Sequence, residues 1–281
     1  MPTAHVNGTD IPYEILGDGG PWVALNPGGR RGMAEIRSLA ARVAASGCRV
    51  LIHDRRNCGA AAVSVGGGNT EHQLWADDLH ALLQHLGALP AVIGGSSSGC
   101  RMSIDFALRY PQAVRGLLLW RVTGGAFAVQ RLTEKYYGEY IRAAQAGGMA
   151  AVCETEHFRE LIAARPANRA ALMAMDPAQF IAAMREWERE FRAGGGEPVI
   201  GASAAQLQSI TVPACVVPGN DRTHPRAAAE KLARLMPGAE LQLLMGEDLD
   251  IDVDPAANWD LKEAGLAAIL TGGLRRMKSP A

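Results

Sequence analysis

The junction between the segment that begins at Ala91 and the segment 102–108 constrains the fold of this chain most strongly. The first segment is a short apolar run that predicts a buried strand, and the second has apolar residues at helical spacing. Between them, Gly95, Ser97 and Gly99 form the pattern Gly-x-Ser-x-Gly. The two glycines allow a strand and a helix to approach closely across a sharp turn, which holds the central serine in a strained conformation with its hydroxyl exposed. The sequence therefore predicts a strand–turn–helix unit around Ser97.

The helix that follows Ser97 has a further consequence for this turn. Its free N–H groups and the positive end of its dipole would point toward the place where a negatively charged oxygen could form beside the serine. A Gly/Ser-rich run is otherwise typical of a plain loop. The flanking strand and helix favour the first interpretation, because the motif requires that context.

Strands and helices alternate along most of the chain, after a hairpin over 5–16 that turns at Asn7-Gly8. This alternation predicts an α/β fold with a mostly parallel, twisted sheet and helices on both faces. From 124 to 208 it gives way to consecutive predicted helices. We therefore expect a core of residues 1–123 and 209–281 with a helical cap, 124–208, inserted into it. The expected strands cover 22–26, 49–53, 114–120, 214–218 and 240–244, and the expected helices 34–46, 70–86, 225–236 and 256–270.

With these features, nearly the whole chain resembles the α/β-hydrolase fold family. Besides the serine turn, the loop from Asp54 to Gly59 is similar to the family's Asp-x-Arg-Gly-x-Gly loop, with Asn57 in place of a glycine. The segment 218–225 is similar to the loop that carries the family's catalytic acid, and the cap is inserted where the family places its lids. The resemblance implies a nucleophilic Ser97 and an acidic Asp221.

The same resemblance implies an oxyanion hole beside Ser97. One N–H would come from Ser98, the residue after the nucleophile, and the other from the loop after the strand 22–26. Where the family usually has His-Gly, this chain has Asn26-Pro27-Gly28-Gly29. Proline has no N–H, so the second donor is expected to be Gly28 or Gly29.

The catalytic base is the larger departure from the family pattern. The family's histidine follows the last strand, but the loop 245–255 contains none. We weighed His157 of the cap as a substitute, and Asp248 (or its neighbour Glu247) in the place of the histidine. A carboxylate is a poor base toward a serine hydroxyl unless burial raises its pKa. His224 follows Asp221 closely, but its His-Pro pair favours the start of a helix.

These residues are consistent with three functions. The leading one is hydrolysis of a small ester, lactone or related acyl substrate through Ser97, with an atypical triad. The second is a non-hydrolytic lyase or isomerase that uses the oxyanion hole to stabilise an enolate. The third is a catalytically silent relative that binds a ligand.

Two sets of charged residues near the predicted site could bind ligands. Arg30 and Arg31 follow the oxyanion loop and could clamp the carboxylate of a small anionic substrate, or could be solvated surface residues. The acidic residues of 247–254 are of the kind that binds calcium, but they lack the central glycine and terminal glutamate of a calcium loop. We therefore expect no metal site.

Composition limits the partners and the compartment. The formal net charge of −1 offers no electrostatic footprint for nucleic acid or an anionic membrane, and no apolar run is long enough to cross a bilayer. The N-terminus lacks the pattern of a secretory signal, and the five cysteines form no CxxC pair. These features predict a cytoplasmic, cofactor-free enzyme with a small-molecule substrate, and they leave a homo-oligomer open.

Overall fold

The fold is built on one mixed sheet in a computed structural model that describes residues 1–66 and 68–278. Residue 67 and the end of the predicted core, 279–281, lie outside the described residues. In the described part, eight strands pair in the order β1-β2-β4-β3-β5-β6-β7-β8. The hairpin β1–β2 and the pair β2–β4 are antiparallel, and the remaining pairs are parallel. The strands are β1 (Thr3–Val6), β2 (Thr9–Leu16), β3 (Trp22–Asn26), β4 (Arg49–His53), β5 (Ala91–Ser96), β6 (Val114–Trp120), β7 (Ala214–Val217) and β8 (Ala239–Leu241).

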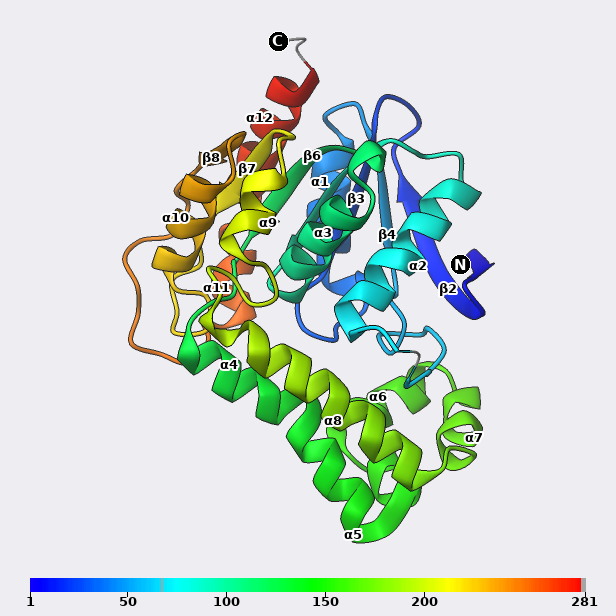
Figure 1. Ribbon diagram of the computed structural model, residues 1–281. Helices are drawn as coiled ribbons and strands as arrows, with labels where there is room; N and C mark the ends of the chain where they lie inside the picture. Colours follow the sequence, from blue (N-terminus) through cyan, green and yellow to red (C-terminus); the bar gives the residue numbers. More distant parts are fainter. Residues whose placement is uncertain (67, 279–281) are drawn as a thin grey trace.

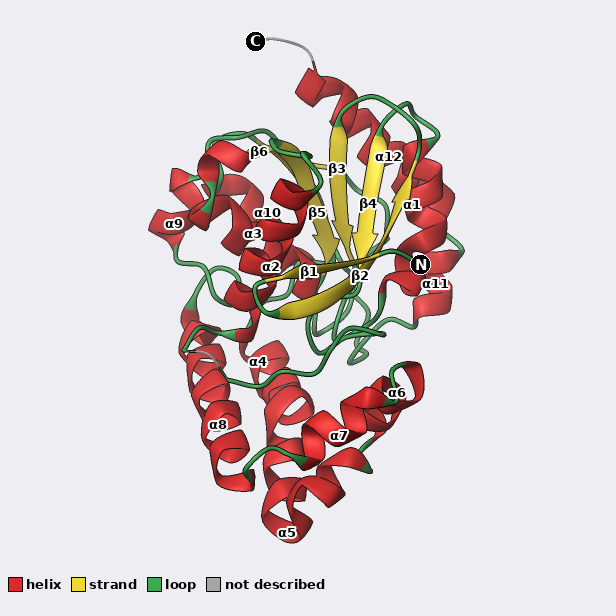
Figure 2. Cartoon of the chain, turned by 90° about the vertical axis from the view of Figure 1, so that its right-hand side faces the viewer, coloured by secondary structure: helices red, strands yellow, loops and turns green. Residues whose placement is uncertain are grey.

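Helices cover both faces of this sheet and also form a separate layer below it (Figures 1 and 2). The helices of the sheet faces are α1 (Arg37–Ala44), α2 (Glu71–His85), α3 (Ser98–Arg109), α9 (Ala204–Ser209), α10 (Arg226–Leu235), α11 (Ala256–Asp260) and α12 (Glu263–Lys278). The helical lobe, as we name the layer below, contains α4 (Ala126–Thr133), the π-turn η3 (Glu134–Gly138), α5 (Glu139–Cys153), α6 (Glu156–Ala164), α7 (Ala167–Met173) and α8 (Pro177–Ala193). Short 3-10 turns occupy η1 (Met33–Ile36), η2 (Pro111–Ala113) and η4 (Gly194–Gly196).

This architecture confirms the predicted α/β class with a mostly parallel sheet. The hairpin turns at Asn7-Gly8, where both residues have a positive φ. Thr70 caps α2 through a capping box with Gln73. Two boundaries differ from the sequence prediction: the strand expected over 240–244 ends at Leu241, and the last expected helix is divided into α11 and α12.

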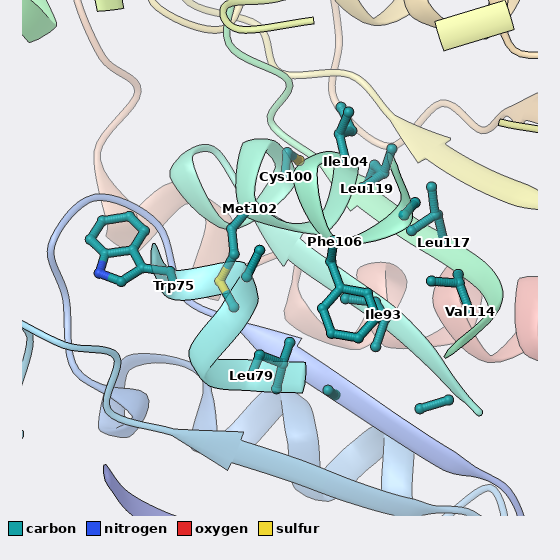
Figure 3. Close-up of a cluster of buried hydrophobic side chains, with 14 of the residues drawn as sticks. Trp75, Leu79, Ile93, Cys100, Met102, Ile104, Phe106, Val114, Leu117 and Leu119 are labelled. Carbon is teal, nitrogen blue, oxygen red and sulfur yellow. The ribbon is translucent and has the colours of Figure 1, made fainter. Parts of the chain in front are cut away.

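The apolar core lies on both sides of β5. All of β5 is buried, as expected for a central parallel strand with helices on each face. On one face, α3 packs over the sheet together with α2, and Figure 3 shows Phe106 and Met102 of α3 beside Leu79 and Ile93. On the other face, α1 and α12 cover Val23, Val50 and their neighbours. This packing fixes the position of the turn between β5 and α3.

The helical lobe has its own apolar cluster, centred on aromatic residues such as Tyr137, Phe158 and Trp187. Its contacts with the rest of the chain include the hydrogen bond from Asn168 Nδ2 to the carbonyl of Ala61. None of the described helices is long and apolar enough to cross a membrane.

Candidate active site

Ser97 occupies the turn between β5 and α3, with φ 52° and ψ −109°. A non-glycine residue adopts such a positive φ only where the surrounding structure enforces it. The flanking glycines show why this turn is so tight. A Cβ added at Gly95 would lie 2.5 Å from the carbonyl carbon of Gly99, and one added at Gly99 would lie 2.6 Å from the carbonyl oxygen of Asn26. The spacing Gly-x-Ser-x-Gly is therefore a steric requirement of this turn.

The hydroxyl of Ser97 lies against an imidazole. His224 Nε2 is 2.9 Å from Ser97 Oγ, and the other ring nitrogen, Nδ1, is 2.9 Å from Oδ1 of Asp221. The hydroxyl of Thr123 is also close, with its Oγ1 3.2 Å from Ser97 Oγ. Serine, imidazole and carboxylate thus form one continuous hydrogen-bonded chain.

These hydrogen bonds determine which ring nitrogen of His224 carries the hydrogen. An ionised carboxylate can only accept hydrogen bonds, so Nδ1 carries the hydrogen that faces Asp221. Nε2 is then free to accept the hydroxyl hydrogen of Ser97. Burial, the largest cause, and the charges of Arg121 and Arg131 lower the pKa of His224 and outweigh Asp221, which raises it. The imidazole is therefore neutral near pH 7, as a general base must be.

Backbone N–H groups hold the carboxylate of Asp221 in place. Oδ1 accepts the N–H of Thr223 at 3.0 Å and that of His224 at 2.8 Å, and Oδ2 accepts the N–H of Asp254 at 2.9 Å. Burial raises the pKa of this carboxyl, but the hydrogen bonds from His224 and the backbone outweigh burial and bring it to about 2. Asp221 is therefore ionised across the neutral pH range.

The loop after β3 lies directly beside Ser97. A Cβ added at Gly28 would be 3.5 Å from the Cβ of Ser97, so the Gly28 backbone packs against the serine. Gly29 has φ 47°, a conformation that favours glycine. Ser98 is the first residue of α3, where backbone N–H groups have no acceptor within the helix. The Gly28 backbone and the first residue of α3 thus both lie next to Ser97.

Arg55 supports this loop, and sequence reasoning missed it. Its guanidinium is fully buried and donates to the carbonyl of Gly29 at 2.8 Å and to Ser98 Oγ at 3.2 Å. The group also lies 4.3 Å from the ring centroid of Trp75. The available signal was the pair of arginines that follows β4, Arg55 and Arg56. Arg56 pairs with Asp78 instead.

The residues predicted to replace the missing histidine do not contact Ser97. In the described part of the chain, the hydrogen-bond partners of Ser97 Oγ are Thr123 and His224. Asp248 is exposed and accepts the backbone N–H of Arg226, so its carboxylate caps the start of α10. His157 lies in the wall of the cavity described below, and burial followed by nearby cations lowers its pKa to about 3.

The expectation that His224 only begins a helix needs correction. Pro225 is the N-cap of α10, and His224 stands just before it. The hydrogen bonds from Thr223 and His224 N–H to Asp221 bend the chain back on itself, and this turn directs the imidazole toward Ser97. An aspartate followed closely by a histidine, immediately after a core strand, was the signal that could have found it.

The two arginines of the oxyanion loop differ in their surroundings. Arg30 is buried, pairs with the buried Glu71 at 3.0 Å and lies between the rings of Tyr136 and Tyr140 of the helical lobe. Its charge is therefore already neutralised. Arg31 is largely exposed, and its Nε is 3.8 Å from Glu35. Of these two arginines, Arg31 is the one that remains accessible to an anionic ligand.

A cavity of about 310 Å³ opens over Ser97 and His224. Its floor comes from the ends of the core strands and its roof from α4, η3, α5 and α6 of the helical lobe. Within the described residues, no group of three or more His, Cys, Asp or Glu side chains could hold a metal ion. The lobe residues that line the cavity are Arg131, Leu132, Lys135, Tyr136, Glu139, Tyr140, Glu156, His157 and Glu160.

Known proteins match this architecture. The family model described as "alpha/beta hydrolase fold" matches residues 21–122. The structure of an enol-lactonase from Burkholderia xenovorans LB400 superimposes with a TM-score of 0.64 at 21% identity, over 98% of this chain and 100% of that one. A thermophilic esterase from Thermogutta terrifontis gives a TM-score of 0.66 at 21% identity, over 99% and 97%. These matches show that the chain has the α/β-hydrolase fold.

A curated relative matches a shorter stretch. It is the uncharacterized hydrolase YraK of Bacillus subtilis (strain 168), 30% identical over 116 residues. The match spans 41% of this chain and 42% of that protein, so it extends over less than half of each. The structure of Est816, described as an N-acyl homoserine lactone degrading enzyme, matches at 22% identity with a TM-score of 0.61, over 96% of this chain and 99% of that one.

Proposed function

We propose that this protein is a serine hydrolase that cleaves a small ester, lactone or related acyl substrate. The observation that carries the proposal is the hydrogen-bonded chain from Ser97 through His224 to Asp221, with both links at 2.9 Å. A serine hydroxyl is a weak nucleophile until an adjacent base takes its proton, and His224 is the base within reach. The α/β-hydrolase fold and the similar proteins named as hydrolase, lactonase and esterase support the same reaction class.

The proposed reaction proceeds through an acyl-enzyme. Ser97 Oγ attacks the substrate carbonyl while its proton passes to Nε2 of His224, and Asp221 stabilises the imidazolium that results. The backbone N–H groups of Gly28 and Ser98 stabilise the negative oxygen. His224 then donates its proton to the leaving group. In the second half, His224 activates water, which releases the acid and restores Ser97.

We also propose that the chain divides into a catalytic core and a cap. Residues 1–123 and 209–281 would form the catalytic core, and 124–208 a cap that closes over the cavity and selects the substrate. The carboxyl ends of parallel strands are a common location for such sites in α/β folds, and the cavity between them and the helical lobe supports the assignment.

The test is labelling with a fluorophosphonate probe, together with hydrolysis of 4-nitrophenyl acetate. We expect wild type to be labelled at Ser97 and Ser97→Ala not to be labelled. His224→Gln should lower kcat/KM by about 10³-fold or more, because the base is lost. Asp248→Asn is the matched control, since its carboxylate is exposed, and it should retain wild-type labelling. Labelling of His224→Gln at the wild-type rate would exclude His224 as the base.

A further inference from the structure

The cavity over Ser97 is charged, and its charges are distributed unevenly. On the lobe side, Arg131, Lys135 and Glu139 follow one another at four-residue intervals, so they line one stripe of α4, η3 and the start of α5. Arg131 is near the catalytic imidazole, because its charge contributes to lowering the pKa of His224. Glu139 is eight residues further along, roughly 12 Å at the helical rise. Along this stripe, the two positive charges therefore lie nearer the triad than the negative one.

The two cations of this stripe have no partner in the described part of the chain. Neither Arg131 nor Lys135 forms a hydrogen bond or ion pair there, whereas their lobe neighbour Arg142 pairs with Glu134. Leaving a half-buried guanidinium unpaired beside a general base is unfavourable unless a ligand supplies the counter-charge. Arg131 and Lys135 are therefore available to an anion that enters the cavity.

Arg121 adds positive charge to the same end. It follows β6 with φ 55°, and its Nη2 lies 3.1 Å from the carbonyl of Asp254 and 3.4 Å from Oδ2 of Asp221. Of the acids near the triad, Asp221 is fully engaged by His224 and the backbone. Glu35 is the other acid near this end, and its carboxylate lies 3.8 Å from Nε of Arg31. The remaining lining acids are Asp254, whose Oδ1 accepts from Asn258, and Glu139, Glu156 and Glu160 of the lobe.

We propose, building on the hydrolase function above, that the substrate carries a carboxylate a few atoms from its scissile carbonyl. Arg131 is the residue that recognises this carboxylate, with Lys135 next to it on the same stripe. A guanidinium can hold a carboxylate through two parallel hydrogen bonds, and the enclosed cavity reduces screening of the charges by water. The substrate class is therefore an anionic ester or lactone, such as a half-ester of a dicarboxylic acid.

The test compares esters that differ only in charge. One pair is mono-4-nitrophenyl succinate and its methyl ester, with the charge on the acyl side. The other is 4-acetoxybenzoate and its methyl ester, with the charge on the leaving group. We expect wild type to prefer the charged member of at least one pair by about ten-fold in kcat/KM at low salt, and added salt to reduce the preference.

Variants of the cations on the stripe test whether these residues cause the preference for charged esters. Arg131→Gln should lower the ratio of charged to neutral ester by about ten-fold, and Lys135→Gln by a smaller factor because Lys135 is more exposed. Arg142→Gln, already paired with Glu134, is the matched control and should keep the wild-type ratio. Fluorophosphonate labelling at Ser97 verifies that each variant is folded.

Two results would overturn the inference. If wild type cleaves the neutral esters and prefers the charged member of neither pair, the hydrolase function stands and anion recognition fails. The same holds if Arg131→Gln leaves the ratio unchanged. If no ester is cleaved and Ser97 is not labelled, the hydrolase function and the inference fail together.

Discussion

Asp221 and His224 belong to a single turn: the carboxylate of Asp221 accepts the backbone N–H of His224 at 2.8 Å and faces the imidazole Nδ1 of the same residue at 2.9 Å. The acid and the imidazole are thus oriented by a local hydrogen-bonded loop directly after β7. The loop after β8, where the family usually carries its histidine, contributes a backbone N–H from Asp254 instead. The order serine, acid, histidine is kept along the chain, while the last two residues share one loop.

Replacing the acid should leave the fold in place and remove most of the activity. Asp221→Asn keeps the size of the side chain but presents a neutral amide to Nδ1 of His224, so the imidazole is held in the wrong tautomer. We expect kcat to fall by about 10⁴-fold. Steady-state hydrolysis of 4-nitrophenyl acetate measures this. Asp252→Asn is the control, because that side chain is exposed and, among the described residues, pairs with Arg222. Equal losses in the two variants would contradict the role of Asp221.

The pH dependence of kcat/KM should report the lowered pKa of His224. Protonated imidazole cannot accept the Ser97 proton, so activity is lost as the pH falls through this pKa. Burial, reinforced by the cations Arg121 and Arg131, lowers that pKa, and the acid limb should therefore have its midpoint below the ordinary histidine value of about 6.5. A profile with its midpoint above that value would be inconsistent with a buried His224 base.

Arg121→Gln tests the cause of this shift. Removing the guanidinium removes a cation that opposes protonation, so the midpoint should move toward higher pH. Arg222→Gln is the control. Arg222 belongs to the same loop as His224 but is directed to Asp252 and the ring of Phe127. A shift in Arg222→Gln of equal size would indicate a general charge effect.

Arg55 should act as a positioning residue for the oxyanion side of the site. Arg55→Met removes its hydrogen bonds to Gly29 and Ser98, and we expect kcat to fall about ten- to a hundred-fold with a smaller change in KM. Arg49 offers a matched control, because it also lies 4.3 Å from a tryptophan ring and donates to a glycine carbonyl, that of Gly20, at the other end of the sheet. Arg49→Met should change kcat by less than about two-fold.

That comparison separates positioning from a loss of stability. Burial of Arg55 makes the variant less stable, so thermal unfolding is followed in parallel and rates are measured well below the melting temperature. Rescue of kcat in Arg55→Lys, which restores a donor near Gly29, would support positioning. A loss of activity that only follows the unfolded fraction would contradict it.

Buried histidines should make the stability of the protein sensitive to acid. Both ring nitrogens of His53 are buried without a partner in the described residues, and burial, followed by the charge of Arg55, lowers its pKa to about 3. Below pH 6.5 the unfolded chain therefore takes up a proton that the folded chain does not. The free energy of unfolding should fall by up to about 1.4 kcal/mol per pH unit for each such group as the pH decreases from 6.5 toward 3.

His53→Leu should reduce this slope and raise the free energy of unfolding at pH 5. Urea unfolding between pH 4 and 7 measures both quantities. His85→Leu is the control, because His85 is exposed at the end of α2 and should leave the slope unchanged. An unaltered slope in His53→Leu would show that His53 is protonated in the folded state.

The sequence by itself determined the class of the fold and the position of the turn that carries Ser97. The alternation of buried strands and amphipathic helices is a local, periodic signal, and it requires a covered parallel sheet. The glycines at 95 and 99 are equally local, because any side chain there would collide with the neighbouring backbone. The prediction of Asp221 as the catalytic acid also rests on a local pattern, because it comes from the resemblance of the segment 218–225 to an acid-bearing loop.

The tertiary structure decided which imidazole lies against that serine. His224 lies 127 residues from Ser97 in sequence and contacts it only because β5, β6 and β7 are neighbours in the sheet, so their carboxyl ends converge. Tertiary packing also pairs Arg30 with Glu71 and leaves Arg131 facing the cavity. Side-chain partners across such distances depend on strand order and on the turn of a loop, and neither produces a periodic pattern in the sequence.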